Sequence, residues 1–259
     1  MKYSFKDIIN SYTKEKRTRS SWWARLVSRP ISFVFTYLFI NLGISANIVS
    51  IISILEVLIA CVLIMLGGKC TVCGVFLYIF WHILDCVDGN IARIKKESSY
   101  VGAFLDAVSG YTAPAFIFLS VGVAAYHTTN LSNEYKYIFI ILGALGSISD
   151  LFSRIIYQKY LVTEYRLGVI NKKENIDTAR EKGLSHIADI IMKNLSYSCL
   201  FMPLLIVALL TNHFDLLIFI YSVYLSCVLV MTVGYFIKKS FDLSKKTENL
   251  LSNENMKDF

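Results

Sequence analysis

The sequence predicts an all-α polytopic membrane protein, with six transmembrane helices preceded by an interfacial amphipathic N-terminal region. Hydrophobic residues make up 55% of the 259 residues and charged residues only 17%, whereas soluble domains carry about 25% charged residues. The charges also gather in short clusters between long apolar runs. An apolar run of about 18 residues or more can cross the hydrocarbon core of a bilayer as a helix. Several such runs are present, which excludes an ordinary soluble domain.

The first 43 residues form the predicted interfacial region. Residues 1–29 contain eight Lys or Arg, interleaved with aromatic residues such as Tyr3, Trp22 and Trp23, a mixture typical of a helix that lies on an anionic membrane surface. A basic segment can also bind nucleic acid, but this one directly precedes membrane spans, so we expect no nucleic-acid partner. Residues 30–43 are apolar but too short to cross the membrane, and we expect a half-buried helix there.

Six apolar segments predict the membrane domain, residues 44–240, which we expect to fold as one unit. The fourth and fifth segments are joined by the only long polar connection, at about 160–186. The polar residues 241–259 are expected to form a tail. The expected spans are about 46–67, 70–93, 100–126, 135–159, 187–211 and 213–237.

The distribution of Lys and Arg predicts the orientation in the membrane. Of the 26 such residues, 24 fall on one side of the six expected spans, and only Lys69 and Lys136 fall on the other. Because cytoplasmic loops carry the excess of Lys and Arg, we expect both termini to be cytoplasmic. The turn at Arg93, Lys95 and Lys96, between the second and third spans, is then cytoplasmic too.

The second and third expected spans carry carboxylates that an apolar helix would not normally contain. Asp85 and Asp88 are three residues apart near the end of the second span, so that both side chains share one helix face. Asp106 follows at the start of the third span. Burying a carboxylate beside apolar helices costs several kcal/mol unless a partner compensates for it. These residues are therefore functional candidates.

Two kinds of partner could compensate for the three carboxylates. Salt bridges to Arg93 or Lys95 could fix the packing of the helices without any chemistry. A hard divalent cation, Mg²⁺ or Mn²⁺, could instead neutralise all three, because these ions prefer oxygen ligands and bind substrates that carry phosphate. We favour the cation, since three acids opposite basic residues that face solvent make a poor packing device. The small residues Gly89, Ala92 and Gly102 would let a nucleotide or a neighbouring backbone approach closely.

These residues resemble the signature of the CDP-alcohol phosphotransferases, also called CDP-alcohol phosphatidyltransferases. The spacing Asp-x2-Asp-Gly-x2-Ala-Arg-x8-Gly-x3-Asp is matched at every position, and the six spans with their N-terminal region extend the resemblance over most of the chain. Ser45-Ala46-Asn47 also looks like the family's Pro-Asn sequence before the first span, with Ala46 in place of Pro. The matched positions are Asp85, Asp88, Gly89, Ala92, Arg93, Gly102 and Asp106.

The resemblance implies a metal-dependent transfer reaction. Asp85, Asp88 and Asp106 would hold one or two Mg²⁺ or Mn²⁺ ions, and an acceptor hydroxyl would attack the β-phosphorus of a CDP-linked donor so that CMP leaves. The donor could be CDP-diacylglycerol with a polar alcohol as acceptor, or a CDP-linked polar alcohol with a lipid or glycan acceptor, so one substrate is expected to be lipidic. A homodimer is implied by the resemblance alone. The positions expected to line the pocket for the cytidine diphosphate are Asn47, Gly89, Ala92, Arg93 and Gly102.

One position departs from the family pattern. The family's fourth Asp, four residues after the third, is assigned as general base and second-metal ligand, and this sequence has Gly110 there. The acceptor could be deprotonated instead by Asp106, by a metal-bound hydroxide, or by His82, which lies one turn before Asp85 on the same face. A single His near a helix end is also a common structural hydrogen-bonding residue. Alternatively, Gly110 makes room for a bulkier or already nucleophilic acceptor.

The predicted function is therefore transfer of a substituted phosphate from a CDP-linked donor to an alcohol, in phospholipid or cell-surface glycolipid or glycan synthesis. The alternative is a catalytically impaired family member that binds CDP-substrates or partners without turning them over. Intramembrane prenyl transfer fits less well, because it needs a second acidic cluster and Asp150, Asp189 and Asp215 occur singly. Asp150 could pair with Arg154 as a structural bridge, or Arg154 could bind an anionic acceptor or lipid phosphate.

Overall fold

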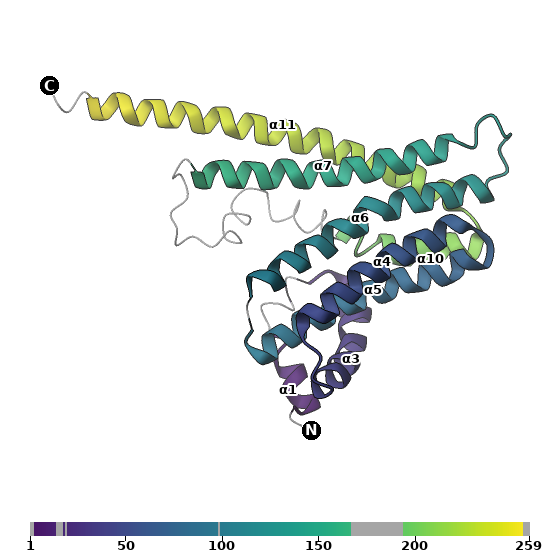
Figure 1. The fold of residues 1–259 in the computed structure, drawn as a ribbon. Helices are drawn as coiled ribbons and strands as arrows, with labels where there is room; N and C mark the ends of the chain where they lie inside the picture. Colours follow the sequence, from purple (N-terminus) through teal and green to yellow (C-terminus); the bar gives the residue numbers. More distant parts are fainter. Residues whose placement is uncertain (1–2, 14–17, 19, 98, 167–193, 256–259) are drawn as a thin grey trace.

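The computed structural model of the protein describes residues 3–13, 18, 20–97, 99–166 and 194–255, and every regular element among them is a helix (Figure 1). The predicted all-α class is confirmed. Five of these helices are long and apolar enough to cross a membrane, as expected of a polytopic membrane protein. They are α4 (Ala46–Leu66), α5 (Gly68–Lys95), α6 (Tyr100–Thr128), α7 (Ile138–Arg166) and the Phe214–Ser244 part of α11 (Phe214–Asn255).

These five helices agree with five of the six expected spans, and the differences lie at their ends. Helix α7 continues to Arg166, into the connection that was expected to be polar. Helix α11 continues to Asn255, so the polar residues from 241 onward extend a helix instead of starting a separate tail. Polar residues are compatible with a helix once it has left the apolar region, and hydropathy alone does not mark where such a helix ends.

The expected span at 187–211 differs from the structure. Residues 187–193 lie outside the described residues, and residues 196–200 form a bend and turns, so that helix α10 covers only Phe201–Thr211. A helix of 11 residues is about 17 Å long, roughly half the thickness of the hydrocarbon core. Pro203 lies in the first turn of α10, where a missing backbone N–H breaks no helical hydrogen bond. The described part of this segment is therefore not a full span.

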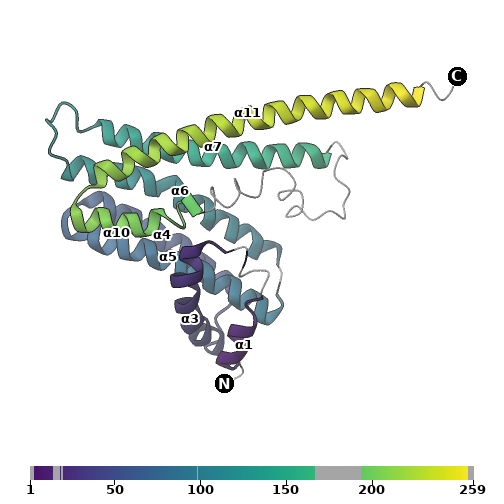
Figure 2. The same cartoon turned by 180° about the vertical axis from the view of Figure 1, so that it is seen from behind.

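The N-terminal region folds across one end of the bundle (Figures 1 and 2). It consists of α1 (Phe5–Asn10), a π-helical turn η1 (Ala24–Ser28) and α3 (Arg29–Asn41). A helix was expected at 30–43, and the structure has α3 there, with Pro30 in its first turn. Helix α1 packs against α3, and α3 packs against α5.

Helix α4 lies between α5 and α6 and connects them. It packs against both α5 and α6, which make few contacts with each other, while α6 packs against α7 and α7 against α11 (Figures 1 and 2). The Ser45 hydroxyl caps α4, and the Ser99 hydroxyl caps α6 by accepting the Gly102 N–H at 2.9 Å. Helices α4 and α6 begin at the end of the bundle where α5 finishes. The first turns of α4 and α6 therefore lie near the last turns of α5.

The crossing of α6 and α7 depends on two glycines. A Cβ atom on Gly143 would lie 2.6 Å from the Phe118 carbonyl oxygen, and one on Gly122 would lie 2.4 Å from the Phe139 carbonyl oxygen. We expect Gly143→Ala to lower the melting temperature of the detergent-solubilised protein, because forcing the helices apart costs about 1–3 kcal/mol. Gly234→Ala is the matched control, since a Cβ atom at Gly234 in α11 would meet nothing within 4 Å. Equal melting temperatures for the two variants would contradict the packing argument.

Candidate functional site

Asp88 is the most deeply buried carboxylate of the motif. Its side chain is only 4% exposed, and its Oδ2 accepts a hydrogen bond of 2.6 Å from the Ser50 hydroxyl of α4. The motif helix α5 is thereby tied to α4 at the level of the acidic residues. One hydroxyl donor compensates only in part for the burial of a carboxylate, so this position favours a further cationic partner.

Asn47 and Gly102 lie side by side, as expected if both line one pocket. A Cβ atom on Gly102 would lie 3.1 Å from Asn47 Oδ1 and 3.0 Å from Ser99 Oγ. A larger residue at position 102 would therefore displace the Asn47 side chain. The contact joins the first turn of α4 to the first turn of α6, which are 55 residues apart in the sequence.

Gly89 and Arg93 also lie together on α5. A Cβ atom on Gly89 would lie 3.2 Å from Arg93 Nη1, so the absence of a side chain at Gly89 leaves the space that the guanidinium occupies. Ala92 is partly exposed at the same end of the helix. The structure thus places the guanidinium of Arg93 over Gly89.

The remaining two motif carboxylates are more accessible than Asp88. Asp85 is partly exposed on α5, and Asp106 is exposed on α6, one turn after Gly102. Carboxylate oxygens suit a hard divalent cation. The three side chains are not gathered as a ligand set, however: within the described part of the chain, no group of three His, Cys, Asp or Glu side chains is placed to hold a metal ion.

Asn90 is a residue of the site that the sequence analysis missed. Its Oδ1 accepts hydrogen bonds from Arg93 Nη2 at 2.6 Å and from Arg29 Nη1 at 3.2 Å. Its Nδ2 donates to Ser32 Oγ at 3.1 Å and to Thr36 Oγ1 at 3.0 Å. The sequence signal that could have drawn attention to it is an amide within an apolar helix, three residues before Arg93. Asn90 connects α3 to the motif.

His82 lies one turn before Asp85, as expected, but it faces the N-terminal region. Its Nδ1 hydrogen-bonds with Ser28 Oγ at 2.7 Å, and both side chains are buried. This contact favours the structural role over that of a general base.

The surroundings of Gly110 are open on one side and aromatic on the other. A Cβ atom at Gly110 would meet nothing within 4 Å, while its carbonyl oxygen accepts a hydrogen bond of 3.1 Å from the Tyr197 hydroxyl. Burial raises the pKa of the Tyr197 phenol, Arg154 lowers it, and Asp150, Asp85 and Asp106 raise it. Tyr197 therefore stays protonated and can donate to Gly110.

Asp150 and Arg154 form the structural bridge that their spacing predicted. Arg154 Nε lies 2.5 Å from Asp150 Oδ2, and Arg154 Nη2 lies 3.4 Å from Asp150 Oδ1. The guanidinium also lies over the Tyr197 ring, 5.0 Å from its centre, and Tyr197 stacks on Trp81 of the motif helix. Arg154 thus supports the aromatic wall beside Gly110.

Glu56 is a second acid inside a membrane helix, and the sequence analysis did not consider it. It lies in the middle of α4, and both of its carboxylate oxygens are buried without a hydrogen-bond partner in the described structure. It is six residues beyond Ser50, about 9 Å further along the helix. Glu56 therefore does not belong to the motif carboxylates.

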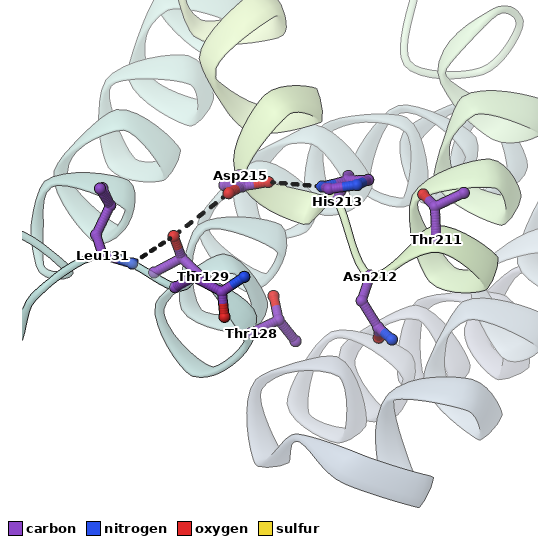
Figure 3. A pocket seen from close by; sticks show the side chains of 8 residues that line it. Thr128, Thr129, Leu131, Thr211, Asn212, His213 and Asp215 are labelled. Carbon is purple, nitrogen blue, oxygen red and sulfur yellow. Dashed lines mark hydrogen bonds and ion pairs between the residues drawn. The ribbon is translucent and has the colours of Figure 1, made fainter.

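A polar pocket lies at the opposite end of the bundle (Figure 3). Its volume is about 620 Å³, and the turns that follow α6 and α10 line it. Asp215 accepts a hydrogen bond of 3.3 Å from Thr129 and lies 3.8 Å from His213 Nδ1. Thr128 is 22 residues beyond Asp106 in α6, which is about 33 Å along the helix. The pocket is therefore separate from the motif.

The fold and the site define the class: an integral membrane protein whose carboxylates, arginines and small residues gather at one end of its helices. The family model for CDP-alcohol phosphatidyltransferase matches residues 43–234. The chain belongs to that family, and the match includes every motif position. Membership supports a transferase that acts on a CDP-alcohol and an alcohol acceptor in lipid synthesis. A search of curated proteins found no match.

Proposed function

We propose that the protein transfers a substituted phosphate from a CDP-linked donor to an alcohol acceptor and releases CMP, in the synthesis of phospholipids or of cell-surface glycolipids or glycans. The observation that supports this best is the position of Asp88. A carboxylate that is 4% exposed and has one hydroxyl donor from α4 is costly in a membrane protein unless a cation compensates for its charge. Such residues are usually functional. Asp88 lies in the same motif as Arg93, whose guanidinium suits phosphate recognition.

The proposed donor pocket is formed by the two pairs of motif residues that the structure brings together. Asn47 lies beside Gly102, and Arg93 lies over Gly89. With Ala92, these residues lie at the neighbouring ends of α4, α5 and α6, where we expect the nucleotide to bind. The amide of Asn47 would donate to or accept from the cytosine or ribose, and Arg93 would bind phosphate oxygens.

The donor chemistry of Asp85, Asp88 and Asp106 fits Mg²⁺ or Mn²⁺, and these residues would hold one or two such ions. When bound, the ion would neutralise charge on the diphosphate of the donor. The chain's own contribution is to keep Asp88 oriented by its bond to Ser50 and to leave Asp106 accessible. Of the two side chains considered as general base, Asp106 is exposed, whereas His82 is buried and hydrogen-bonded to Ser28. We therefore assign proton removal from the acceptor to Asp106.

We infer that the active site faces the cytoplasm, with both termini on that side. The support is the sequence distribution: the six expected spans put 24 of the 26 Lys and Arg residues on the side of the motif. The proposed domain division is an interfacial region at 1–43, a membrane domain at 44–240 and a polar segment at 241–259. A homodimer remains a prediction from the family.

The second candidate function is binding of CDP-substrates without turnover. It is favoured by one observation, the absence of a carboxylate at Gly110 in otherwise open space. Loss of general-base help slows a reaction about 10²–10⁴-fold, and the two functions therefore differ in measured turnover.

The test is an assay of CMP release by the purified protein, with a panel of CDP-alcohols and alcohol acceptors. We expect release that requires both an acceptor and Mg²⁺ or Mn²⁺ and that EDTA abolishes. Binding of CDP-alcohols without CMP release from any acceptor would favour the second candidate. Failure to bind any cytidine nucleotide would overturn both.

His82→Gln distinguishes a base from a structural residue at position 82. We expect CMP release to remain within about fivefold of the wild-type rate, because Gln can still hydrogen-bond with Ser28, whereas loss of a general base costs about 10²–10⁴-fold. The rate should be measured with saturating donor, alongside the melting temperature. A loss of 100-fold or more with an unchanged melting temperature would assign the base to His82 after all.

A further inference from the structure

Two arginines from different parts of the chain converge on one amide oxygen. Arg93 Nη2 lies 2.6 Å and Arg29 Nη1 lies 3.2 Å from Asn90 Oδ1. Arg93 belongs to the family motif, whereas Arg29 is the first residue of the interfacial helix α3 and lies outside the matched region. Two guanidinium groups that share a neutral acceptor lie close enough to repel each other.

Neither guanidinium has the partners that its charge requires. No carboxylate forms an ion pair with Arg29 or Arg93 in the described part of the chain. The Nε atoms of both residues are buried and have no hydrogen-bond partner there. An unsatisfied buried donor costs about 1–3 kcal/mol, and more when it is charged. Such a pair of cations is explained if an anion with several oxygens binds between them.

The surroundings hold Arg29 in this position. Its guanidinium lies over the Tyr12 ring, 5.2 Å from the ring centre, and Asn90 is itself fixed by Ser32 and Thr36 of α3. Arg93 in turn lies over Gly89, so the two arginines flank the pocket proposed for the donor. A guanidinium fork that is already oriented loses little entropy when it binds a phosphate.

We propose that Arg29 is a second phosphate-binding arginine of the donor site and that it contacts the diphosphate of the CDP-linked donor together with Arg93. This inference rests on the proposed function. It gives the N-terminal region a role in substrate binding: α3 would carry part of the nucleotide site, positioned through Asn90. The same chemistry would suit the phosphate of an anionic lipid, which the experiment separates from the nucleotide.

The experiment compares Arg29→Gln with Arg25→Gln in the full-length, detergent-purified protein. Arg25 is the matched control, because it is an exposed arginine one turn before Arg29, and within the described residues its side chain donates a hydrogen bond only to the Ser20 carbonyl. Calorimetric titration with CDP in the presence of Mg²⁺ gives the affinity for the nucleoside diphosphate. Competition by cytidine gives the affinity for the nucleoside without its phosphates. Arg29→Lys keeps the charge without the planar fork, and melting temperatures report folding.

We expect Arg29→Gln to weaken CDP binding about tenfold or more while cytidine binding is unchanged, because a charge-assisted hydrogen bond to phosphate is lost. Arg29→Lys should fall between Arg29→Gln and the wild type, and Arg25→Gln should stay within twofold of the wild type. CDP binding by Arg29→Gln within twofold of wild type would overturn the inference and leave the proposed function standing. So would an equal loss of CDP and cytidine binding with a lowered melting temperature, which indicates a packing role.

Two further outcomes are distinguishable. If Arg29→Gln binds CDP normally but no longer binds vesicles that contain phosphatidylglycerol in preference to pure phosphatidylcholine vesicles, the anion is a lipid phosphate and the assignment to the donor is wrong. If the wild-type protein itself binds no CDP, the proposed function fails together with the inference.

Discussion

Replacing Asp88 with Asn should lower the rate of CMP release about 10²–10³-fold, the size of effect expected when one electrostatic element of an active site is removed. Asn has nearly the shape of Asp and can still accept the hydrogen bond that Ser50 donates at 2.6 Å. The variant therefore removes the charge without leaving a cavity between α4 and α5. The rate should be measured with a range of Mg²⁺ concentrations.

Ser50→Ala is the control for Asp88→Asn. It removes the hydroxyl donor but keeps the carboxylate, and we expect a loss of about tenfold or less, since one hydrogen bond to a charged group is worth about 1.5–3 kcal/mol in total and only part of this acts on the reaction. A folded Asp88→Asn variant that releases CMP at the wild-type rate would remove Asp88 from the reaction. It would leave the burial of this carboxylate without a functional explanation.

Gly110→Asp is the second substitution for which we expect a large change in turnover. A Cβ atom at this position meets nothing within 4 Å, so the new carboxylate can be accommodated one turn beyond Asp106 on α6. If the missing carboxylate limits proton removal from the acceptor, we expect CMP release to increase about 10²–10⁴-fold. The measurement is the single-turnover rate with a saturating acceptor, because product release can hide a faster chemical step.

Gly110→Asn is the matched variant, equal in size and without a basic group. A rate increase in Gly110→Asp but not in Gly110→Asn would show that Asp106 alone does not supply the full general-base help. Equal losses in both variants would show that the open space at Gly110 receives the acceptor, the interpretation in which glycine makes room for a larger alcohol. Equal rates in all three proteins would contradict any role for position 110 in the reaction.

Much of the fold could be predicted because a long apolar run in the sequence indicates a helix that can cross a membrane. The apolar runs that contain Ser50, Trp81 and Phe118 each became a helix close to its expected range, since a backbone in hydrocarbon must satisfy its own hydrogen bonds. The segment before Phe201 shows the limit. Its composition suits a span, but Ser196 and Ser198 bond to each other in a turn, and such a local alternative to the helix leaves no trace in a hydropathy average.

In the candidate site, contacts within one helix could also be predicted, whereas contacts between helices could not. Spacing along one helix places Asp85 near Asp88 and Gly89 near Arg93, because residues three or four apart share a face. The contacts of Asn90 with Arg29, Ser32 and Thr36 could not be predicted, since nothing in the sequence fixes how α3 crosses α5. The same holds for His82, whose partner Ser28 is 54 residues away. Long-range polar contacts depend on the packing of helices, which a single sequence does not specify.

The most direct test of the central claim follows the β-phosphorus of the donor. The CDP-alcohol that gives the fastest CMP release should be prepared with a radioactive β-phosphorus and incubated with the protein, its acceptor and Mg²⁺, and the products should be separated. The account predicts unlabelled CMP and a label that appears in the alcohol product in equal amount. Label in CDP, or release of CMP with the label transferred only to water when the acceptor is saturating, would contradict transfer to an alcohol at this site.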